Sequence, residues 1–359
     1  MIVKNEALVI RRCLDSVLSI IDHWVIVDTG STDGTQDIIR AHMAKLPGTL
    51  HDRPWIDFAH NRSESLALAR PHADYSLVID ADDFLEPLDV STALELSLDC
   101  YTMDIIDTPV LYTRKQLVNN RLSWCYRSVL HEYIDCGQEH TVGHLPWRMR
   151  RNHDGARRRD AKTYVKDAQI LLKALDTEQD PFLRSRYTFY LAQSYRDCQQ
   201  FEAAITHYQQ RAQMAGWQEE VFVSLYQVAK LKERLGLPDE EVLAAYEAAS
   251  QSSSTRIEAL HGASRFCRIK GRYAEGYQLA LRGLGKPYPA GALFGEPWIY
   301  ETGLLDELAV NAYWIEKYTE SLDACLRILA TEKMSGPDFQ RVVGNAQYAL
   351  QKIAVRMAV

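Results

Sequence analysis

Three carboxylates gather at one point in the chain, directly after an apolar run. Asp80, Asp82 and Asp83 follow residues 77–79, which favour a strand buried on both faces of a parallel sheet. Such sheets bind ligands at the carboxyl ends of their strands, where Asp80 and Asp82 would share a face. Carboxylates this close repel one another unless a cation lies beside them. We therefore expect Mg²⁺ or Mn²⁺, which prefer oxygen ligands. On these residues alone, an acidic turn without a ligand is equally compatible.

The segments before this cluster are predicted to form a β-α-β unit. Residues 2–3 resemble a strand end, residues 6–21 carry apolar side chains at helical spacing, and residues 24–27 form a second apolar run. The loop that follows begins at Asp28 and offers Ser, Thr and Asp side chains to cap a helix over residues 36–44. This arrangement suits the base and ribose of a nucleotide, although a plain strand-to-helix turn gives the same pattern.

Arg62 lies between this loop and the acidic cluster. A weak strand near Leu50 precedes it, and a helix over residues 64–69 is expected to begin just after it. Arginine makes bidentate contacts with phosphate, and a helix N-terminus adds a favourable field. A surface arginine with no functional role is the default alternative, but the position of Arg62 between the loop and the acidic cluster favours a role in binding.

The composition limits the kind of protein. A chain of 359 residues suggests two or three domains, and 47% hydrophobic with 25% charged residues is typical of a soluble globular protein. No apolar run approaches the roughly 20 residues that span a bilayer. The first six residues lack the pattern of a signal peptide, and the seven cysteines form no CxxC pair, so we expect a reducing, cytoplasmic location. A net charge of −7 argues against generic nucleic-acid binding.

Four motifs occur together in a familiar order. They are Met-Ile-Val-Lys-Asn-Glu at 1–6, Val-Asp-Thr-Gly-Ser-Thr-Asp-Gly-Thr at 27–35, Asp-Phe-Ala-His-Asn-Arg-Ser at 57–63 and Ile-Asp-Ala-Asp-Asp at 79–83. Their order and spacing resemble those of family 2 glycosyltransferases, which are GT-A enzymes that use nucleotide-diphosphate sugars. The resemblance covers roughly the first 160 residues. The chain departs from the family at Thr29, where a second Asp is common, and in its short first strand.

The resemblance implies roles for individual residues. Asp28 and its loop would hold the base and ribose, and Arg62 the base or the diphosphate. Asp80 would lie on the ribose side and Asp82 on the metal, with Asp83 as the alternative metal ligand. These remain expectations drawn from the likeness.

Residues 99–152 resemble the half of such a domain that receives the acceptor. Residues 105–112 and 129–134 are predicted to be strands, and the pair His131-Glu132 stands where the family carries its catalytic acid. Inverting transfer needs a carboxylate that removes the acceptor's proton, and Glu132 is the candidate. By the resemblance, His153 would be a further metal ligand, with His131 as the second choice.

Two short basic clusters surround His153. Arg158 and Lys162 belong to the second cluster, and a mobile basic loop could stabilise a departing diphosphate. A solvated loop is the simpler alternative. The histidines between 131 and 153 match no zinc spacing, and the clusters are too short and too poor in aromatics to indicate RNA binding.

From residue 161 onward, helical periodicity replaces the strand pattern. Ala192, Ala229, Ala263 and Ala309 occupy positions typical of the tetratricopeptide repeat (TPR), a helical hairpin of about 34 residues, although an irregular bundle fits as well. Three stacked hairpins are expected before an insertion that contains Pro287, Pro289 and Pro297. Such repeats present a concave surface that binds peptides or another subunit. Exposed apolar residues on a last helix over residues 339–355 would favour a homodimer.

The sequence therefore predicts a GT-A transferase domain over residues 1–160 and a TPR-like domain over residues 161–359. The expected activity is inverting, metal-dependent sugar transfer from a nucleotide-diphosphate donor, with UDP as the first choice, to a protein, peptide or glycan. A catalytically inactive nucleotide-binding scaffold is the alternative. A nucleotidyltransferase ranks last because residues 1–12 contain no glycine-rich loop.

Overall fold

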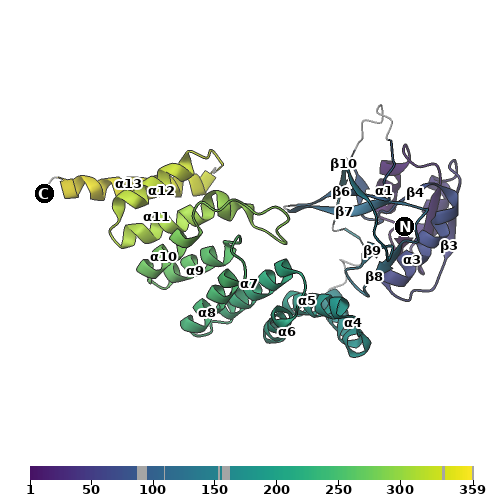
Figure 1. Cartoon of the computed structure of the whole chain (residues 1–359). Helices are drawn as coiled ribbons and strands as arrows, with labels where there is room; N and C mark the ends of the chain where they lie inside the picture. The colour runs from purple at the N-terminus through teal and green to yellow at the C-terminus, as the bar shows by residue number, and fades with distance from the viewer. Residues whose placement is uncertain (87–94, 109, 153, 156–161, 334–335, 358–359) are drawn as a thin grey trace. The chain divides into compact units, whose positions relative to one another are not determined.

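The chain forms two compact units, Met1–Leu183 and Arg184–Val359, and each is described by itself. The computed structural model describes all residues except 87–94, 109, 153, 156–161, 334–335 and 358–359. Sheets occur in the first unit, and the described part of the second is helical (Figure 1). The predicted domain boundary, residue 160, lies outside the described residues and stays a prediction.

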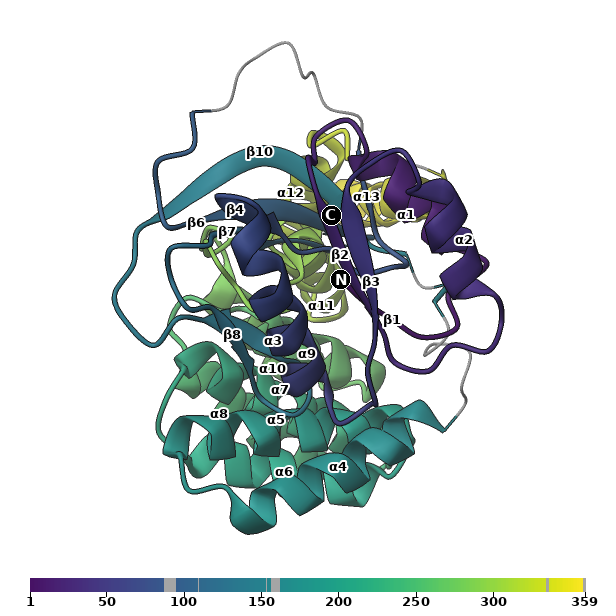
Figure 2. The ribbon, with the colours of Figure 1, turned by 90° about the vertical axis from the view of Figure 1, so that its right-hand side faces the viewer.

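A parallel sheet with helices opens the first unit. Its elements are β1 (Ile2–Val3), α1 (Ile10–Val17), β2 (Trp24–Asp28), α2 (Thr35–His42), β3 (Gly48–Asp52) and α3 (Phe58–Ala69). The strands pair in the order β1-β2-β3. Figure 2 shows α1 and α2 together at one side of these strands, with α3 at the other. The predicted β-α-β unit is confirmed, but α1 is shorter than the expected helix over residues 6–21, and Leu8 is exposed.

A mixed sheet and a short ribbon complete this unit. The elements are the 3₁₀ turn η1 (Arg70–His72), β4 (Tyr75–Leu77), β5 (Phe84–Leu85), β6 (Cys100–Asp107), β7 (Val110–Asn119), β8 (Cys125–Arg127), β9 (Tyr133–Asp135), β10 (Val142–Arg150) and α4 (Thr163–Thr177). The order in the five-stranded sheet is β4-β7-β6-β10-β5, and β8 pairs with β9. Of these pairings only β6 with β10 is parallel.

Three predicted strands differ from the structure. The run at 77–79 was expected in a parallel sheet, but β4 ends at Leu77 and pairs antiparallel with β7 at the sheet edge. The predicted strand over 105–112 is confirmed only in part, because residues 105–107 end β6, residues 110–112 begin β7, and the chain turns between them. The predicted strand over 129–134 is confirmed only for its last two residues, which belong to β9. Ser128 and His131 have φ values of 86° and 51°, which interrupt an extended chain, so β9 begins only at Tyr133.

The second unit consists of stacked helical hairpins. The helices are α5 (Pro181–Asp197), α6 (Phe201–Gln213), α7 (Gln218–Arg234), α8 (Asp239–Ser252), α9 (Glu258–Ile269), α10 (Tyr273–Gly283), η3 (Ile299–Gly303), α11 (Leu304–Trp314), α12 (Tyr318–Leu329) and α13 (Gly336–Met357). α7 packs against α8, α9 against α10 and α11 against α12. Ala192, Ala229, Ala263 and Ala309 are all buried, so small residues let the helices approach as predicted. The TPR-like arrangement is confirmed.

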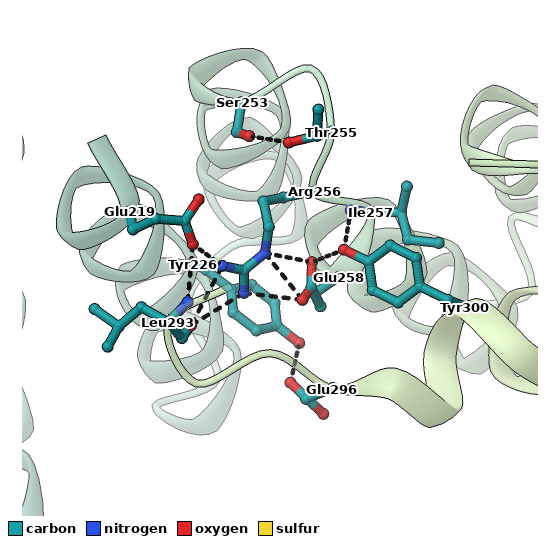
Figure 3. Close-up of polar contacts among 10 residues, drawn as sticks. All are labelled: Glu219, Tyr226, Ser253, Thr255, Arg256, Ile257, Glu258, Leu293, Glu296 and Tyr300. Carbon is teal, nitrogen blue, oxygen red and sulfur yellow. Dashed lines mark hydrogen bonds and ion pairs between the residues drawn. The ribbon is translucent and has the colours of Figure 1, made fainter. Parts of the chain in front are cut away.

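A buried polar network fixes the proline-containing insertion between α10 and η3 (Figure 3). Arg256 pairs with Glu258, and both side chains are almost wholly buried. It also pairs with Glu219 and donates to the carbonyl oxygen of Leu293 at 3.2 Å. Tyr300 donates to Glu258 at 2.8 Å. The insertion is therefore an ordered part of the helical unit, because buried charges of this kind are costly unless every partner is in place.

Candidate active site

The loops after β1 and β2 are joined by hydrogen bonds, which brings the first two motifs together. The backbone N–H of Asn5 donates to Ser31 Oγ at 2.8 Å, and the Asn5 side chain accepts from Thr32 N at 2.8 Å. The N–H of Glu6 donates to Thr35 Oγ1 at 2.9 Å. Two segments far apart in sequence thus form one polar edge at the carboxyl ends of parallel strands, the place where such sheets bind ligands.

Asp28, the last residue of β2, lies buried at this edge. Its Oδ1 accepts hydrogen bonds from the N–H groups of Gly30 and Ser31 and from the side chain of Gln36, at 2.8–2.9 Å. Burial alone would raise the pKa of Asp28, but these hydrogen bonds lower it below its ordinary value. The second oxygen, Oδ2, is buried and has no hydrogen-bond partner among the residues that the structure describes. The hydrogen bonds to Oδ1 therefore favour the ionised form of Asp28 at this edge of the sheet.

Arg62 lies in the first turns of α3, and its environment is dominated by two carboxylates. Asp57 caps the helix by accepting from His60 N at 2.7 Å, which explains why α3 begins earlier than the predicted residue 64. Arg62 Nη2 lies 2.5 Å from Asp80 Oδ1, and Nε lies 2.6 Å from Glu132 Oε1. The second contact is an ion pair without the alignment of a hydrogen bond. One guanidinium therefore links the end of the apolar run to the candidate base.

The three acids of the cluster have different environments. Burial would raise the pKa of Asp80, but the charge of Arg62 beside it holds that pKa well below its usual range. Burial and the neighbouring Asp80 raise the pKa of Asp82, and the same two causes raise that of Asp83 to about 7. Arg114 Nη2 lies 3.6 Å from Asp83 and 3.9 Å from Asp80. Negative charge is therefore only partly neutralised here.

Glu132 stands in a strained connection that α3 holds in place. Ser63 Oγ accepts from Tyr126 N at 2.8 Å, so the helix residue beside Arg62 anchors β8. The ring of Tyr126 lies 5.6 Å from the Arg62 guanidinium, and burial raises the pKa of Tyr126 to about 12. Left-handed backbone at non-glycine residues is uncommon and clusters at functional sites. Ser128 and His131, which both have positive φ, lie in the segment that leads to Glu132 and fit this pattern.

The comparison with known protein families agrees with this geometry. Residues 1–175 match the model of the family described as "Glycosyl transferase family 2". Residues 1–175 are a glycosyltransferase family 2 domain. The resemblance seen in the four motifs is thereby confirmed for this part of the chain.

Curated relatives match shorter stretches. A TPR repeat-containing protein of Synechococcus elongatus is 35% identical over 144 residues, which is 38% of this chain and 34% of the relative. An uncharacterized glycosyltransferase of Rickettsia felis is 38% identical over 86 residues, 23% of this chain and 28% of that protein. The chain thus spans about a third or less of the length of the curated relatives it matches.

Solved structures share little sequence with this chain. Residues 1–349 of TarS from S. aureus, solved in complex with UDP-GlcNAc, are 12% identical and cover 82% of this chain and 97% of their own, with a TM-score of 0.34. The C-terminal part of a TPR repeat-containing protein from Cytophaga hutchinsonii is 13% identical and covers 54% of this chain and 68% of its own, with a TM-score of 0.41. The assignment of the hairpins rests on this chain's own helices.

The structure brings together some of the residues predicted for the site. Within the family 2 domain, Arg62 contacts both Asp80 and Glu132, and Asp82 follows Asp80 in the same turn. Lys162 is exposed at the start of α4. His153 and Arg158 lie outside the described residues, so their predicted roles stay predictions.

The acidic turn of the family 2 domain fits a hard divalent cation. Its donors are carboxylate oxygens, and in the described part of the chain both oxygens of Asp83 are buried without a hydrogen-bond partner. Gly155 lies so near that a Cβ built on it would come 2.5 Å from Asp82 Oδ2. Among the described residues no group of three or more His, Cys, Asp or Glu side chains is arranged as a metal site. The turn therefore offers part of a ligand set.

Sequence reasoning missed three residues of this site. Arg12 on α1 and Arg114 on β7 both contact the acidic turn, and Tyr126 packs on Arg62. The apolar spacing of residues 6–21 does not indicate a role for Arg12, and Arg114 lies beyond the end of the strand predicted over residues 105–112. The contacts of these three residues join positions far apart in sequence, so no local sequence pattern predicts them. In the described part of the chain no helix has the length and apolar character needed to cross a bilayer.

Proposed function

We propose that the protein is an inverting glycosyltransferase that moves a sugar from a nucleotide-diphosphate donor, with UDP as the first choice, to a nucleophilic acceptor. The observation that carries this proposal is the contact of Arg62 with both Asp80 and Glu132 in a family 2 domain. A residue expected on the donor side and a candidate base therefore meet at one guanidinium. Sugar transfer needs this proximity, because donor and acceptor must react at a single carbon.

In the proposed reaction, Glu132 accepts the proton of an acceptor hydroxyl while the acceptor oxygen bonds to the anomeric carbon. The bond from that carbon to the diphosphate breaks, and the nucleoside diphosphate leaves from the opposite face, which inverts the configuration. Asp28 and Asp80 would hold the base and ribose. Arg62, Arg158 and Lys162 would bind the diphosphate electrostatically.

Asp82, with His153, would hold Mn²⁺ or Mg²⁺. A bound divalent cation would offset charge on the leaving diphosphate, an effect worth several kcal/mol. The support from the described residues is the oxygen-rich turn with its incompletely neutralised carboxylates.

The decisive experiment is a nucleotide screen followed by a transfer assay. UDP, GDP and dTDP are tested by thermal shift with and without Mn²⁺, since a ligand at 100 times its Kd stabilises by about 2.7 kcal/mol. Asp82→Asn should abolish sugar transfer and donor hydrolysis without loss of the fold, whereas the exposed Asp22→Asn should leave both unchanged. Absence of Mn²⁺-dependent nucleotide binding in the wild type would instead favour an inactive scaffold.

For the helical unit we propose acceptor binding or self-association. The acceptor would be a protein, peptide or glycan. Phe339, Leu350 and Val355 of α13 are exposed by 37%, 55% and 64%, and apolar exposure of this kind supports a homodimer. Sedimentation of wild type and Leu350→Glu separates these roles. A monomeric wild type would remove the dimer from the proposal.

A further inference from the structure

Helix α1 contacts the acidic turn of the first unit through its side chains. Arg12 Nη2 donates to the carbonyl oxygen of Asp82 at 2.9 Å, and one helical turn later Ser16 Oγ accepts from the N–H of Leu85 at 3.0 Å. Residues four apart lie on the same face of a helix, so both contacts come from one face of α1. The backbone on either side of the acidic turn is thus fixed to this helix.

Arg12 also binds the segment that follows β10. Its Nη1 and Nη2 donate to the two carboxylate oxygens of Asp154 at 2.8 Å and 2.9 Å. The next residue, Gly155, approaches the Asp82 carboxylate so closely that any larger residue there would have to push it away. One guanidinium therefore joins two segments that are about 70 residues apart in sequence and meet at Asp82.

The simplest alternative is a surface ion pair of no consequence. The side chains of Arg12 and Asp154 are 38% and 50% exposed, and such pairs contribute little to stability. Two features go beyond that alternative. The fork geometry is bidentate, which fixes orientation, and the remaining nitrogen, Nε, is buried without a hydrogen-bond partner among the described residues. Arg12 also binds the main-chain carbonyl of Asp82, a candidate metal ligand. It therefore fixes the position of Asp82 more than it stabilises the fold.

We infer that Arg12 is a positioning residue for the proposed metal and diphosphate site. It fastens residues 154–155 against Asp82, and so sets how well the acidic turn binds a divalent cation with a nucleotide. The inference rests on the proposed function. It assigns a role to Arg12, Asp154 and Gly155, none of which is expected to touch the substrate.

The test measures nucleotide binding, not turnover. Calorimetry with UDP in saturating Mn²⁺, or with whichever nucleotide the screen selects, gives the Kd of wild type and Arg12→Gln. Residues that orient metal ligands typically change affinity by about 10–100-fold when substituted, and we expect a loss in this range. The melting temperature without ligands should stay within about 2–4 °C of the wild-type value, because an exposed ion pair contributes little to stability. Arg11→Gln removes the same charge from the exposed neighbouring position and should bind like wild type.

Two further variants separate position from charge. Asp154→Asn removes one partner of Arg12, and the double variant should bind no worse than Arg12→Gln alone, because Arg12→Gln already breaks the contact with Asp154. Gly155→Ala keeps every charge but adds a Cβ that would lie 2.5 Å from Asp82 Oδ2. The Asp82 carboxylate would have to move, so this variant should weaken nucleotide binding as well.

The possible failures are distinguishable. If wild type binds no nucleotide with Mn²⁺, the proposed function fails and this inference fails with it. If wild type binds but Arg12→Gln binds equally well, or Arg11→Gln is equally impaired, the inference alone is overturned.

Discussion

Replacing Arg62 by Met tests the central contact of the candidate site. The substitution removes the cation but keeps most of the apolar stem, and it leaves Asp80 and Glu132 facing each other. The side chains of Arg62, Asp80 and Glu132 are only 13%, 19% and 13% exposed, so little water can replace the lost cation. Removing one partner of a buried ion pair costs about 3–5 kcal/mol. Residual exposure places the expected loss at the lower end, about 3 kcal/mol.

The loss should depend on pH in a defined direction. Arg62 lowers the pKa of Asp80 in the folded state, so this pair contributes stability above the unfolded pKa of about 3.9 and loses it as pH falls further. In Arg62→Met, the ionised carboxylates of Asp80 and Glu132 have lost the cation between them and repel each other. Protonation of either one at lower pH relieves this repulsion. The difference between wild type and variant should therefore be largest at pH 7 and shrink toward pH 4.

Urea and thermal unfolding at pH 7 and pH 4.5 measure this difference. For a unit of 183 residues, Met1–Leu183, a loss of about 3 kcal/mol corresponds to roughly 6–12 °C in Tm. Arg53→Met is the matched control, because Arg53 and its partner Glu64 are 37% and 29% exposed and the pair should contribute under about 1 kcal/mol. A loss under 1 kcal/mol for Arg62→Met, or a loss equal at both pH values, would refute the reasoning.

Three further predictions concern the base, the acidic turn and the helical unit. Glu132→Gln should reduce sugar transfer by about 10²–10⁴-fold with nearly unchanged nucleotide Kd, and retained turnover would remove it as the base. The raised pKa of Asp83, about 7, makes its contribution to stability complete below pH 4 and lost as pH rises through 7. Asp83→Asn with EDTA should therefore stabilise the protein by roughly 1–3 kcal/mol at pH 8 and less at pH 5, and urea unfolding that shows no such pH difference would contradict this. Arg256→Met leaves the buried Glu258 without its cation and should lower the free energy of unfolding by about 3–5 kcal/mol. The more exposed Arg282→Met should lower it by under about 1 kcal/mol. Similar urea midpoints for the two variants would contradict this prediction.

The sequence by itself determined the order of the parts. Four motifs predicted the family 2 domain, and small residues at repeated positions predicted the helical hairpins, because local patterns report which face of an element is buried. Asp28, Arg62 and Asp80 could be named because each stands beside the end of a predicted element, and Glu132 could be named because the family resemblance implies a catalytic acid at its position.

Only the tertiary structure decided which of these residues meet. The ion pair of Arg62 with Glu132 spans 70 positions, and Arg12 reaches Asp154 across 142 positions. The direction in which β4 pairs also depends on tertiary structure. A short apolar run fits parallel and antiparallel sheets alike, and pairing with β7 fixed β4 as antiparallel. The physical reason is common to both cases. Ion pairs and strand pairing depend on through-space distance, which local sequence periodicity does not encode.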